Sequence, residues 1–347
     1  MTSRAPFREF ALRGGLDAGR RVRVLERLKG DRYEVIDILA DGGMGILFRA
    51  RDHRTGGNLV LIKAVKYDTG EFGYDRRNAL YHVYRMRQQF KREKNILMEM
   101  AHRGVNQVPN INDFFHDRNP ELEREFPFGW FDATEELVVP GGQVEVPVGL
   151  EPFVVMERIM GRSVRDMVGH LTEARTLEIA RSVCLLLDRV HRPRGRPDGT
   201  ELSFVYMDLK PDNLLVDGHG GVWLVDFGAA IPVVDGVRKG KGAYTPGFAA
   251  PEVRRIGHPS AVVDARADLY SLGAILFQAL SRGRVDPMSL ARPTEDEFPV
   301  LPIDALRGDI HPLTLEVVTR SLARDPEERF ASAGQMRLAI DAALRAV

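Results

Sequence analysis

The sequence predicts an α+β fold in which a strand-rich first part is followed by a helical second part. Between residues 33 and 65, apolar runs separated by glycine turns are typical of β-strands. From Gly161 onward, apolar residues recur mostly at the spacing of helices. Strands gathered in one part of the chain and helices in the other favour an α+β protein over one that alternates strands and helices.

The composition narrows the class of protein. A chain of 347 residues is long enough for two parts with separate cores, and 44% hydrophobic and 28% charged residues are ordinary for a globular protein. The formal net charge is zero, so we expect no nucleic-acid partner. Cys184 is the only cysteine, which excludes a disulfide framework. Because no long apolar run and no signal-peptide pattern occur, we expect a cytoplasmic protein without a membrane span.

The first part of the chain begins with a basic extension over residues 1–31. We interpret it as a solvated lead-in with at most one edge strand, or as a docking or autoregulatory segment. Strands are expected over 33–65, where Tyr-Glu-Val-Ile-Asp-Ile-Leu, Ile-Leu-Phe-Arg-Ala and Leu-Val-Leu-Ile-Lys-Ala-Val are separated by glycine turns. One long helix is expected over about 77–101, and another strand over 152–156.

Residues 117–150 are an insert rich in proline, glycine, acidic and aromatic residues, and Leu-Val-Val-Pro-Gly-Gly-Gln-Val-Glu-Val within it predicts a hairpin. Such a length between strands is uncommon without a function or disorder. We therefore keep two interpretations, a local cover for the sheet and a surface for a regulatory partner. Helices are expected after it over 174–191, 264–281, 313–324 and 333–345.

Four side chains with useful chemistry lie close together in the sequence between residues 206 and 228. Asp208 could take a hydroxyl proton, and the Lys210 ammonium could neutralise a phosphoryl group. Asn213 and Asp226 offer the oxygen ligands that Mg²⁺ prefers. Phosphoryl transfer depends mostly on positioning and charge neutralisation, and these are the groups that it needs.

The segment Tyr-Met-Asp-Leu-Lys-Pro-Asp-Asn-Leu-Leu-Val with its following Asp-Phe-Gly resembles the catalytic loop and metal-binding motif of eukaryotic-like, bacterial-type serine/threonine protein kinases. The resemblance extends from Tyr33 to Leu344. It implies a bilobal protein-kinase fold, with an N-lobe over 32–159 and a helical C-lobe over 160–347. It also implies ATP and Mg²⁺ as cofactors and transfer to Ser or Thr hydroxyls of a protein substrate, including the kinase itself.

Within this resemblance Asp208 orients the substrate hydroxyl, Lys210 stabilises the transferring group, and Asn213 and Asp226 hold Mg²⁺. Thr245 would lie beside Asp208 and Lys210.

Lys63 ends Val-Leu-Ile-Lys, which resembles the strand carrying the kinase lysine. The period of a strand places Leu61, Lys63 and Val65 on one face, where an ammonium needs a partner. Glu93 shares a helical stripe with apolar residues, and the resemblance pairs it with Lys63, which then holds the α- and β-phosphates. The alternatives are that Lys66 is the functional lysine and that Glu93 is a surface residue.

The glycine-containing segment between the first two strands would approach the phosphates of ATP. Ala40 stands where the family has glycine, and this departure is expected to stiffen the loop and weaken nucleotide affinity. Leu61 stands where the family has alanine, and the larger side chain is expected to narrow the pocket. For the apolar residues that would contact adenine, membership of an ordinary hydrophobic core is an equally good explanation. The resemblance assigns nucleotide contacts to Ala40, Gly42, Gly43, Gly45, Leu47, Leu61, Lys63, Met156, Glu157, Ile159 and Leu215.

Two further departures concern regulation. Tyr206-Met207-Asp208 replaces His-Arg-Asp, and methionine cannot pair with a phosphorylated loop as the family's arginine does. The stretch from Ala229 to Tyr244 also contains no Ser or Thr. We therefore expect a kinase that the usual loop phosphate does not switch on. The cluster of Arg238, Lys239 and Lys241 is either a solvated loop or a surface for an acidic substrate or partner.

Three structural residues favour a protein kinase over a small-molecule phosphotransferase. Glu252 is expected to pair with Arg329, and Asp268 to brace the catalytic loop. A pseudokinase scaffold that binds nucleotide and regulates a partner without turnover remains the main alternative, because Ala40, Leu61, Tyr206 and Met207 depart from the family pattern.

Overall fold

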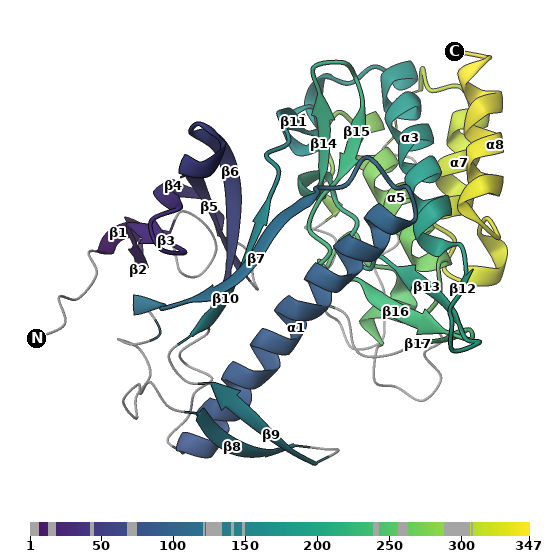
Figure 1. The fold of residues 1–347 in the computed structure, drawn as a ribbon. Coiled ribbons are helices and arrows are strands. Elements are labelled where there is room, and N and C mark those ends of the chain that lie inside the picture. Colours follow the sequence, from purple (N-terminus) through teal and green to yellow (C-terminus); the bar gives the residue numbers. More distant parts are fainter. Residues whose placement is uncertain are drawn as a thin grey trace, which may run out of the picture. The chain divides into compact units, whose positions relative to one another are not determined.

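The protein was analysed as a computed structural model (Figure 1). The structure describes residues 7–12, 19–41, 45–67, 75–120, 122, 134–139, 142–147, 150–238, 243–255, 263–287, 306 and 308–347. The chain divides into two compact units, the first formed by 1–98 with 110–158 and the second by 99–109 with 159–347. Gly42, Gly43, Lys239, Lys241 and most of the acidic and aromatic residues of the insert lie outside the described residues.

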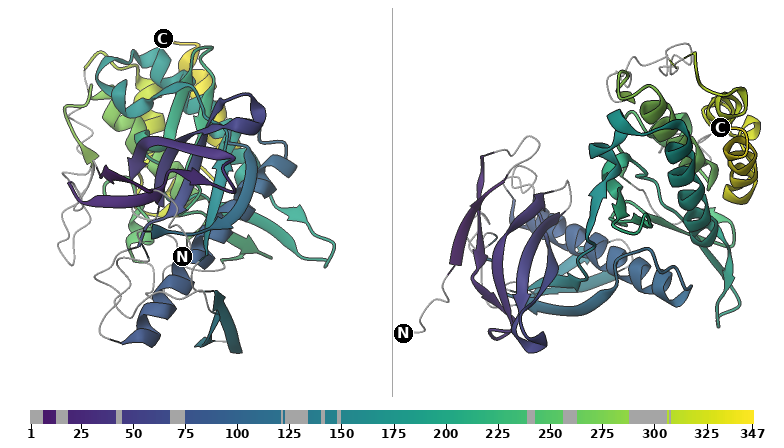
Figure 2. Two further views of the ribbon diagram at one scale, coloured as in Figure 1. Left: turned by 60° about the vertical axis from the view of Figure 1, so that its left-hand side comes forward. Right: turned by 90° about the horizontal axis from the view of Figure 1, so that it is seen from above.

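The first unit is built on an antiparallel sheet with the strand order β3-β4-β5-β6-β10-β7 (Figures 1 and 2). Two smaller antiparallel pairs, β1-β2 and β8-β9, accompany it. The strands are β1 Phe7–Ala11, β2 Arg21–Leu25, β3 Arg27–Leu28, β4 Tyr33–Asp41, β5 Gly45–Asp52, β6 Asn58–Val65, β7 Ile111–Asp117, β8 Thr134–Val139, β9 Gly142–Pro147 and β10 Glu151–Met156. The expected strands over 33–65 and 152–156, and the hairpin in the insert, are thus confirmed.

Alternate residues of the sheet enter two different apolar clusters. On β6, Ile62 and Ala64 pack on one side, while Leu61 and Val65 pack on the other with residues of α1, Arg76–His102. This is the two-residue period expected of a sheet buried on both faces. Lys63 lies between Leu61 and Val65 in the sequence, so it belongs to the face that packs against α1.

The N-terminal segment contributes more than the edge strand expected for it. Strands β1, β2 and β3 form there, and β3 joins the main sheet at its edge. Five apolar side chains of this segment are 6% exposed or less and belong to the core of the sheet: Leu12, Val22, Val24, Leu25 and Leu28. The interpretation of a solvated lead-in was therefore wrong for these residues, because alternating valines gave the segment one apolar face.

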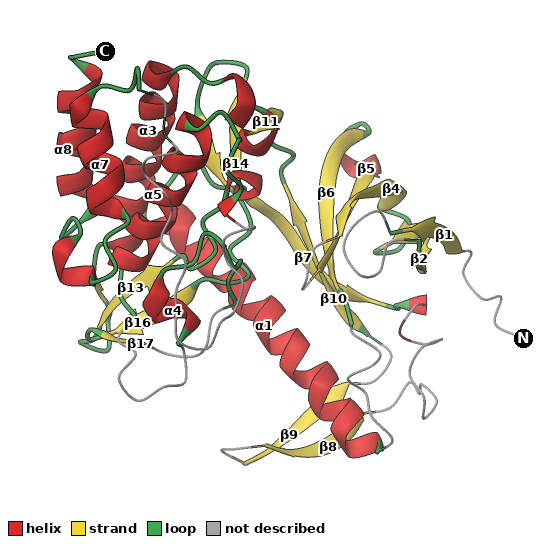
Figure 3. Cartoon of the chain, turned by 180° about the vertical axis from the view of Figure 1, so that it is seen from behind, coloured by secondary structure: helices red, strands yellow, loops and turns green. Residues whose placement is uncertain are grey.

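The second unit is mainly helical (Figure 3). Helices α3, α5, α7 and α8 pack together, and two small sheets have the orders β11-β14-β15 and β12-β13-β16-β17. The helices are α3 Glu173–His191, α4 Pro251–Arg254, α5 Arg266–Leu280, α7 Pro312–Ser321 and α8 Ala333–Leu344. The strands are β11 Gly161–Ser163, β12 Arg194–Gly195, β13 Glu201–Val205, β14 Leu214–Asp217, β15 Val222–Leu224, β16 Ile231–Val234 and β17 Val237–Arg238.

The four long helices of this unit occur where the sequence predicted them. Thr172 caps α3 by accepting a hydrogen bond from Arg175 N at 3.1 Å, and Ser332 caps α8 in the same way. Gly273 lets α5 and α7 approach closely, since a Cβ added there would lie 2.6 Å from Ser321 Cβ. No helix within the described ranges is long and apolar enough to cross a lipid bilayer.

Candidate active site

The second unit brings Asp208, Lys210 and Thr245 into one hydrogen-bonded cluster. Lys210 Nζ lies 2.6 Å from Asp208 Oδ2 and donates to Thr245 Oγ1 at 2.9 Å. The Thr245 hydroxyl in turn donates to Asp208 Oδ1 at 2.5 Å. Thr245 comes from a segment 37 residues away, so tertiary structure creates the cluster. The expected place of Thr245 is confirmed, and the arrangement holds a hydroxyl against a carboxylate and an ammonium.

Asn213 and Asp226 are brought together by the β14–β15 pair. Val225 N donates to Asn213 O at 3.0 Å, which places Asn213 beside the residue preceding Asp226. The amide nitrogen of Asn213 donates to Asp208 O at 2.8 Å, and the amide oxygen accepts no hydrogen bond from the described part of the chain.

An amide oxygen and an exposed carboxylate are suitable ligands for Mg²⁺, so these residues fit the cation that the family implies. Within the described ranges, no group of three or more His, Cys, Asp or Glu side chains could hold a metal ion alone. The cation's other ligands would therefore be phosphate oxygens and water.

Asp268 binds the backbone of the loop that contains Tyr206 and Met207. Its two carboxylate oxygens accept hydrogen bonds from Tyr206 N and Met207 N, each at 2.8 Å, and His191 Nε2 lies 2.8 Å away. Met207 has a φ of 74°, a left-handed conformation that costs energy in a residue with a side chain. The fully buried Asp268 offsets this strain, so the expectation that it braces the loop is confirmed.

Tyr206 occupies a packing position next to the Asp226 segment. Its hydroxyl donates to Val225 O and to Asp226 O, the latter at 3.0 Å. Its ring meets the buried Phe227 ring edge to face with centroids 5.0 Å apart. Tyrosine at this position therefore links the segment around Asp208 to the Asp-Phe-Gly motif through both its ring and its hydroxyl.

The expected ion pair between Glu252 and Arg329 is present. Arg329 Nη1 and Nη2 donate to the two Glu252 oxygens at 2.7 and 2.9 Å, and the Arg329 side chain is fully buried. The remaining donors of Arg329 reach three backbone carbonyls. Such a bidentate, fully hydrogen-bonded guanidinium fixes the start of α4, which follows the Thr245 segment.

In the first unit, Lys63 and Glu93 form the predicted ion pair. Lys63 Nζ lies 2.6 Å from Glu93 Oε1, and both side chains are largely buried. Glu93 lies in the buried stripe of α1 together with Phe90, Leu97 and Met100, as the sequence indicated. The alternatives of a functional Lys66 and a surface Glu93 are not supported by this contact.

The strand after the glycine-containing turn lies close to Lys63. A Cβ added at Gly45 would lie 2.8 Å from Lys63 Cε and 3.2 Å from Ala64 O, so glycine leaves room for the lysine side chain. Ala40 lies in β4 opposite Leu47, where the extended backbone accepts alanine. The departure from glycine at this position therefore requires no unusual backbone conformation.

The remaining residues assigned to the nucleotide lie in both units. In the first unit Leu61 and Met156 are buried in the cluster that packs against α1, with Leu47 partly buried beside them. Glu157 N already donates to Asn110 O at 3.0 Å, so only its carbonyl could meet an adenine. In the second unit, Ile159 and Leu215 are half-buried.

A second buried charge on α1 was not anticipated from the sequence. Arg87 Nε donates to Glu151 Oε1 at 3.1 Å, and Tyr67 OH donates to Glu151 Oε2 at 2.5 Å. The sequence did carry an indication of this buried charge, because Arg87 stands at an apolar position of the helical stripe, between Val83 and Phe90.

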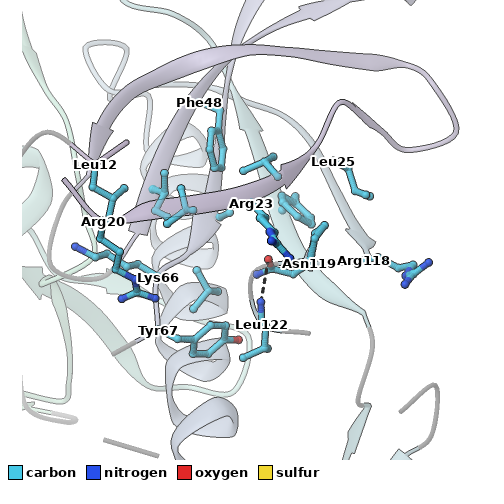
Figure 4. Close-up of a pocket in the computed structure, with 17 residues that line it drawn as sticks. Leu12, Arg20, Arg23, Leu25, Phe48, Lys66, Tyr67, Arg118, Asn119 and Leu122 are labelled. Atoms are coloured by element: carbon cyan, nitrogen blue, oxygen red, sulfur yellow. Dashed lines mark hydrogen bonds between the residues drawn. The ribbon is translucent and has the colours of Figure 1, made fainter. Parts of the chain in front are cut away.

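A pocket in the first unit lies under the N-terminal strands, with Leu12, Arg20 and Arg23 at one side and Tyr67 and Leu122 at the other (Figure 4). None of the residues assigned to the nucleotide lines it. The cavity volume is about 30 Å³, far below the roughly 300–1,000 Å³ of a typical ligand pocket. This pocket is therefore too small for a nucleotide and is separate from the candidate site.

Comparison with known proteins agrees with this geometry. The family model described as "Protein kinase domain" matches residues 33–333. The chain belongs to the protein kinase family. In this kinase domain the matched region includes every residue of the predicted site.

Curated relatives of this kinase domain are bacterial serine/threonine-protein kinases. PknB of Mycobacterium tuberculosis is 26% identical over 321 residues, which cover 88% of this chain and 42% of PknB. PksC of Streptomyces coelicolor is 28% identical over 326 residues, covering 89% of this chain and 48% of PksC. The chain thus spans less than half the length of these relatives.

Among solved structures, the PknI kinase domain of Mycobacterium tuberculosis matches 92% of this chain and 99% of its own, with a TM-score of 0.55 and 20% identity. This likeness confirms the bilobal protein-kinase fold, with a strand-rich N-lobe and a helical C-lobe, that the sequence predicted.

Proposed function

We propose that this kinase domain transfers the γ-phosphoryl group of ATP to Ser or Thr hydroxyls of protein substrates, including its own. The cluster of Asp208, Lys210 and Thr245 carries the proposal, because a threonine hydroxyl already lies within hydrogen-bond distance of the proposed base and of an ammonium. A substrate hydroxyl beside Thr245 would be oriented by Asp208 in the same way, while Lys210 offsets charge on the transferring group.

The remaining roles follow from the other contacts. Lys63, held by Glu93, would bind the α- and β-phosphates. Asn213 and Asp226 would hold Mg²⁺, which neutralises phosphate charge when it is bound. Protein substrates are supported by the Thr245 segment and by the Glu252–Arg329 pair that anchors the α4 start after it.

We further propose that activity does not depend on the usual activation-loop phosphate. Met207 is 2% exposed and belongs to an apolar cluster with Ala249, Val253 and Tyr270. A methionine in such a cluster offers no cation for a phosphate, and apolar packing takes over the anchoring of the segment that follows Thr245. This interpretation agrees with the absence of Ser and Thr between Ala229 and Tyr244.

The first experiment measures transfer from γ-labelled ATP with Mg²⁺ to the protein itself and to a generic protein substrate. Asp208→Asn is expected to reduce the rate by about 10²- to 10⁴-fold, the usual contribution of a positioned general base. Asp212→Asn, the same change at an exposed carboxylate on the adjoining turn, is the matched control and should retain activity.

Label on Ser or Thr that disappears only in Asp208→Asn would support the kinase. The pseudokinase scaffold would become the better interpretation if ATP and Mg²⁺ stabilised the wild-type protein thermally without any transfer. Transfer to free sugars or aminoglycosides but not to protein would instead favour a small-molecule phosphotransferase.

The proposal that activity does not depend on an activation-loop phosphate needs a separate measurement. Active protein is treated with a phosphatase and its phosphopeptides are mapped before and after treatment. We expect full activity without phosphate in the loop. Phosphorylation of Tyr244 or Thr245 whose removal abolishes activity would contradict the proposal.

A further inference from the structure

The first unit contains a buried triad of Tyr67, Arg87 and Glu151, which joins three separate elements. Tyr67 follows β6, Arg87 lies in α1 and Glu151 begins β10. Their exposed fractions are 6%, 5% and 1%. Charged groups at this depth require near-complete pairing, so the triad is under strong geometric constraint.

The hydrogen bonds of the triad use both oxygens of one carboxylate. Arg87 donates through Nε and Nη2 to Glu151 Oε1, and Tyr67 donates to Glu151 Oε2 at 2.5 Å. Burial and the nearby carboxylate raise the pKa of Tyr67 well above its usual value, so the phenol stays protonated and donates. Burial alone would lower the pKa of Arg87, but Glu151 outweighs it and keeps the guanidinium charged.

The triad ties α1 to the same part of the sheet as the Lys63–Glu93 pair, which joins α1 to β6. Lys63 lies in β6 opposite Val154 of β10, four residues before Tyr67, and Glu93 lies six residues after Arg87 on α1. Six residues correspond to about 9 Å along a helix. Two polar links at this separation constrain both the rotation and the axial position of α1 on the sheet, in addition to the apolar packing of the helix.

We propose that Tyr67, Arg87 and Glu151 are positioning residues that hold α1 in the rotation at which Glu93 meets Lys63. This inference rests on the proposed function, because it assigns to Lys63 the binding of ATP phosphates. The triad acts through Glu93 and touches no substrate. Glu151 directly follows the insert, and Val139 of β8 packs with the apolar cluster that includes residues of α1, so the insert adjoins this positioning device.

The test compares Tyr67→Phe with a matched control in the same unit. Tyr33 also donates to a carboxylate that an arginine contacts, since its hydroxyl bonds to Asp113 Oδ2 at 2.7 Å and Arg32 Nη1 bonds to the same oxygen at 3.0 Å. Tyr33 packs in the cluster on the sheet face that does not include α1. Tyr33→Phe therefore removes the same chemistry without touching the helix.

A second variant keeps the interior filled. The double variant, Arg87→Met with Glu151→Leu, is made in Tyr67→Phe, so that apolar side chains replace the whole buried triad, a change that is often neutral or stabilising for folding. We measure the melting temperature, the affinity for ATP with Mg²⁺ by calorimetry, and amide hydrogen exchange of residues 83–97. Each variant is also made in a Glu93→Gln background.

We expect Tyr67→Phe and the double variant to weaken ATP binding by about tenfold, the size of one hydrogen bond's net contribution, and to speed exchange in α1. Tyr33→Phe should lower the melting temperature without either effect. In the Glu93→Gln background, Tyr67→Phe should change ATP affinity no further, because its action passes through Glu93.

Unchanged ATP affinity and α1 exchange in the double variant would overturn the inference, as would equal losses in Tyr33→Phe. If the wild-type protein binds no ATP, the proposed function fails, and hydrogen exchange alone then tests the positioning role of the triad. Faster α1 exchange in Tyr67→Phe but not in Tyr33→Phe would then still support the positioning role, and equal exchange would refute it.

Discussion

At the scale of the residue, the Thr245 hydroxyl donates to Asp208 at 2.5 Å and accepts from Lys210 at 2.9 Å. Thr245→Val keeps the shape of the side chain but removes both hydrogen bonds. We expect kcat to fall about ten- to a hundredfold, because hydrogen bonds to charged groups contribute about 1.5–3 kcal/mol. Steady-state kinetics with a protein substrate measure this loss. Thr245→Ser keeps the hydroxyl and should retain most of the wild-type rate.

Thr200 provides the matched control for this prediction. Its hydroxyl donates to Asp198 at 2.6 Å in an exposed turn, so Thr200→Val removes a similar bond outside the site. Equal kcat in Thr245→Val and wild type, or an equal loss in Thr200→Val, would contradict the role of Thr245.

Single residues of the site were predictable where a short motif carried them. Asp208, Lys210 and Asn213 lie within six residues, and local spacing alone indicated their chemistry. The left-handed backbone of Met207 was not predictable, because Asp268, 61 residues away, imposes it through tertiary hydrogen bonds. Arg87 was missed for a related reason, since only the fold brings Glu151 to it.

At the scale of the element, Arg329 ties α4 to the region before α8. It donates to both Glu252 oxygens and to the carbonyls of Ala323, Arg324 and Arg266. Arg329→Met would leave a largely buried carboxylate and three carbonyls without this donor, and we expect a loss of about 3–5 kcal/mol in unfolding free energy. Urea denaturation measures it.

Arg337→Met is the control for this element, since Arg337 forms a partly exposed pair with Asp341 one turn further along α8 at 2.8 Å. Helix pairs of this kind typically contribute less than about 1 kcal/mol. A similar small effect in Arg329→Met would show that the Glu252 segment does not depend on this ion pair.

Two carboxyl groups of the first unit, Asp52 and Asp113, should make its stability sensitive to acid. Hydrogen bonds from Arg32 lower the pKa of Asp52 against the effect of burial. Burial acts to raise the pKa of Asp113, but hydrogen bonds from Lys29 and Tyr33 outweigh it, and the pKa is lowered. Carboxyls with a lower pKa in the folded state stabilise it above their unfolded pKa, about 3.9, and lose this contribution as pH falls through the folded value.

We therefore expect the unfolding free energy to decrease steeply below about pH 4. Asp113→Asn should lower stability at neutral pH and flatten this acid dependence, whereas Asp212→Asn at an exposed position should do neither. Urea unfolding between pH 3 and 7 provides the measurement. An unchanged pH slope in Asp113→Asn would refute the assignment.

Whole elements followed closely from periodicity where one pattern dominated. The stripe of α1 and the alternation of β6 both predicted which residues are buried, including the polar Lys63 and Glu93. The strand β2 reads Arg-Val-Arg-Val-Leu and carries the same alternation, but its arginines favoured a solvated interpretation. Burial of every second residue was therefore a stronger indicator than the net charge of the segment.

At the scale of the whole molecule, the family match and the buried core begin at different places. The match starts at residue 33, which suggests that the preceding segment is dispensable. However, Leu12, Val22, Val24, Leu25 and Leu28 lie in the core of the sheet. Lys29 also pairs with Asp113 at 2.6 Å and so ties this segment to β7.

A chain that begins at Arg32 should therefore be strongly destabilised. Each buried Leu or Val side chain contributes about 1.5–3 kcal/mol, and the sum is comparable with the total of about 5–15 kcal/mol for a typical domain. We expect the shortened chain to be insoluble or to melt many degrees lower, as calorimetry would measure.

Paired substitutions within β2 separate burial from charge. Val22→Thr with Val24→Thr should reproduce part of the loss, and Arg21→Ala with Arg23→Ala on the alternate positions should cause less. Equal melting temperatures for the full and shortened chains would contradict a core role for residues 1–31 and would show that they are an accessory segment. The opposite result would extend the folding unit of this kinase domain beyond the region that its family shares.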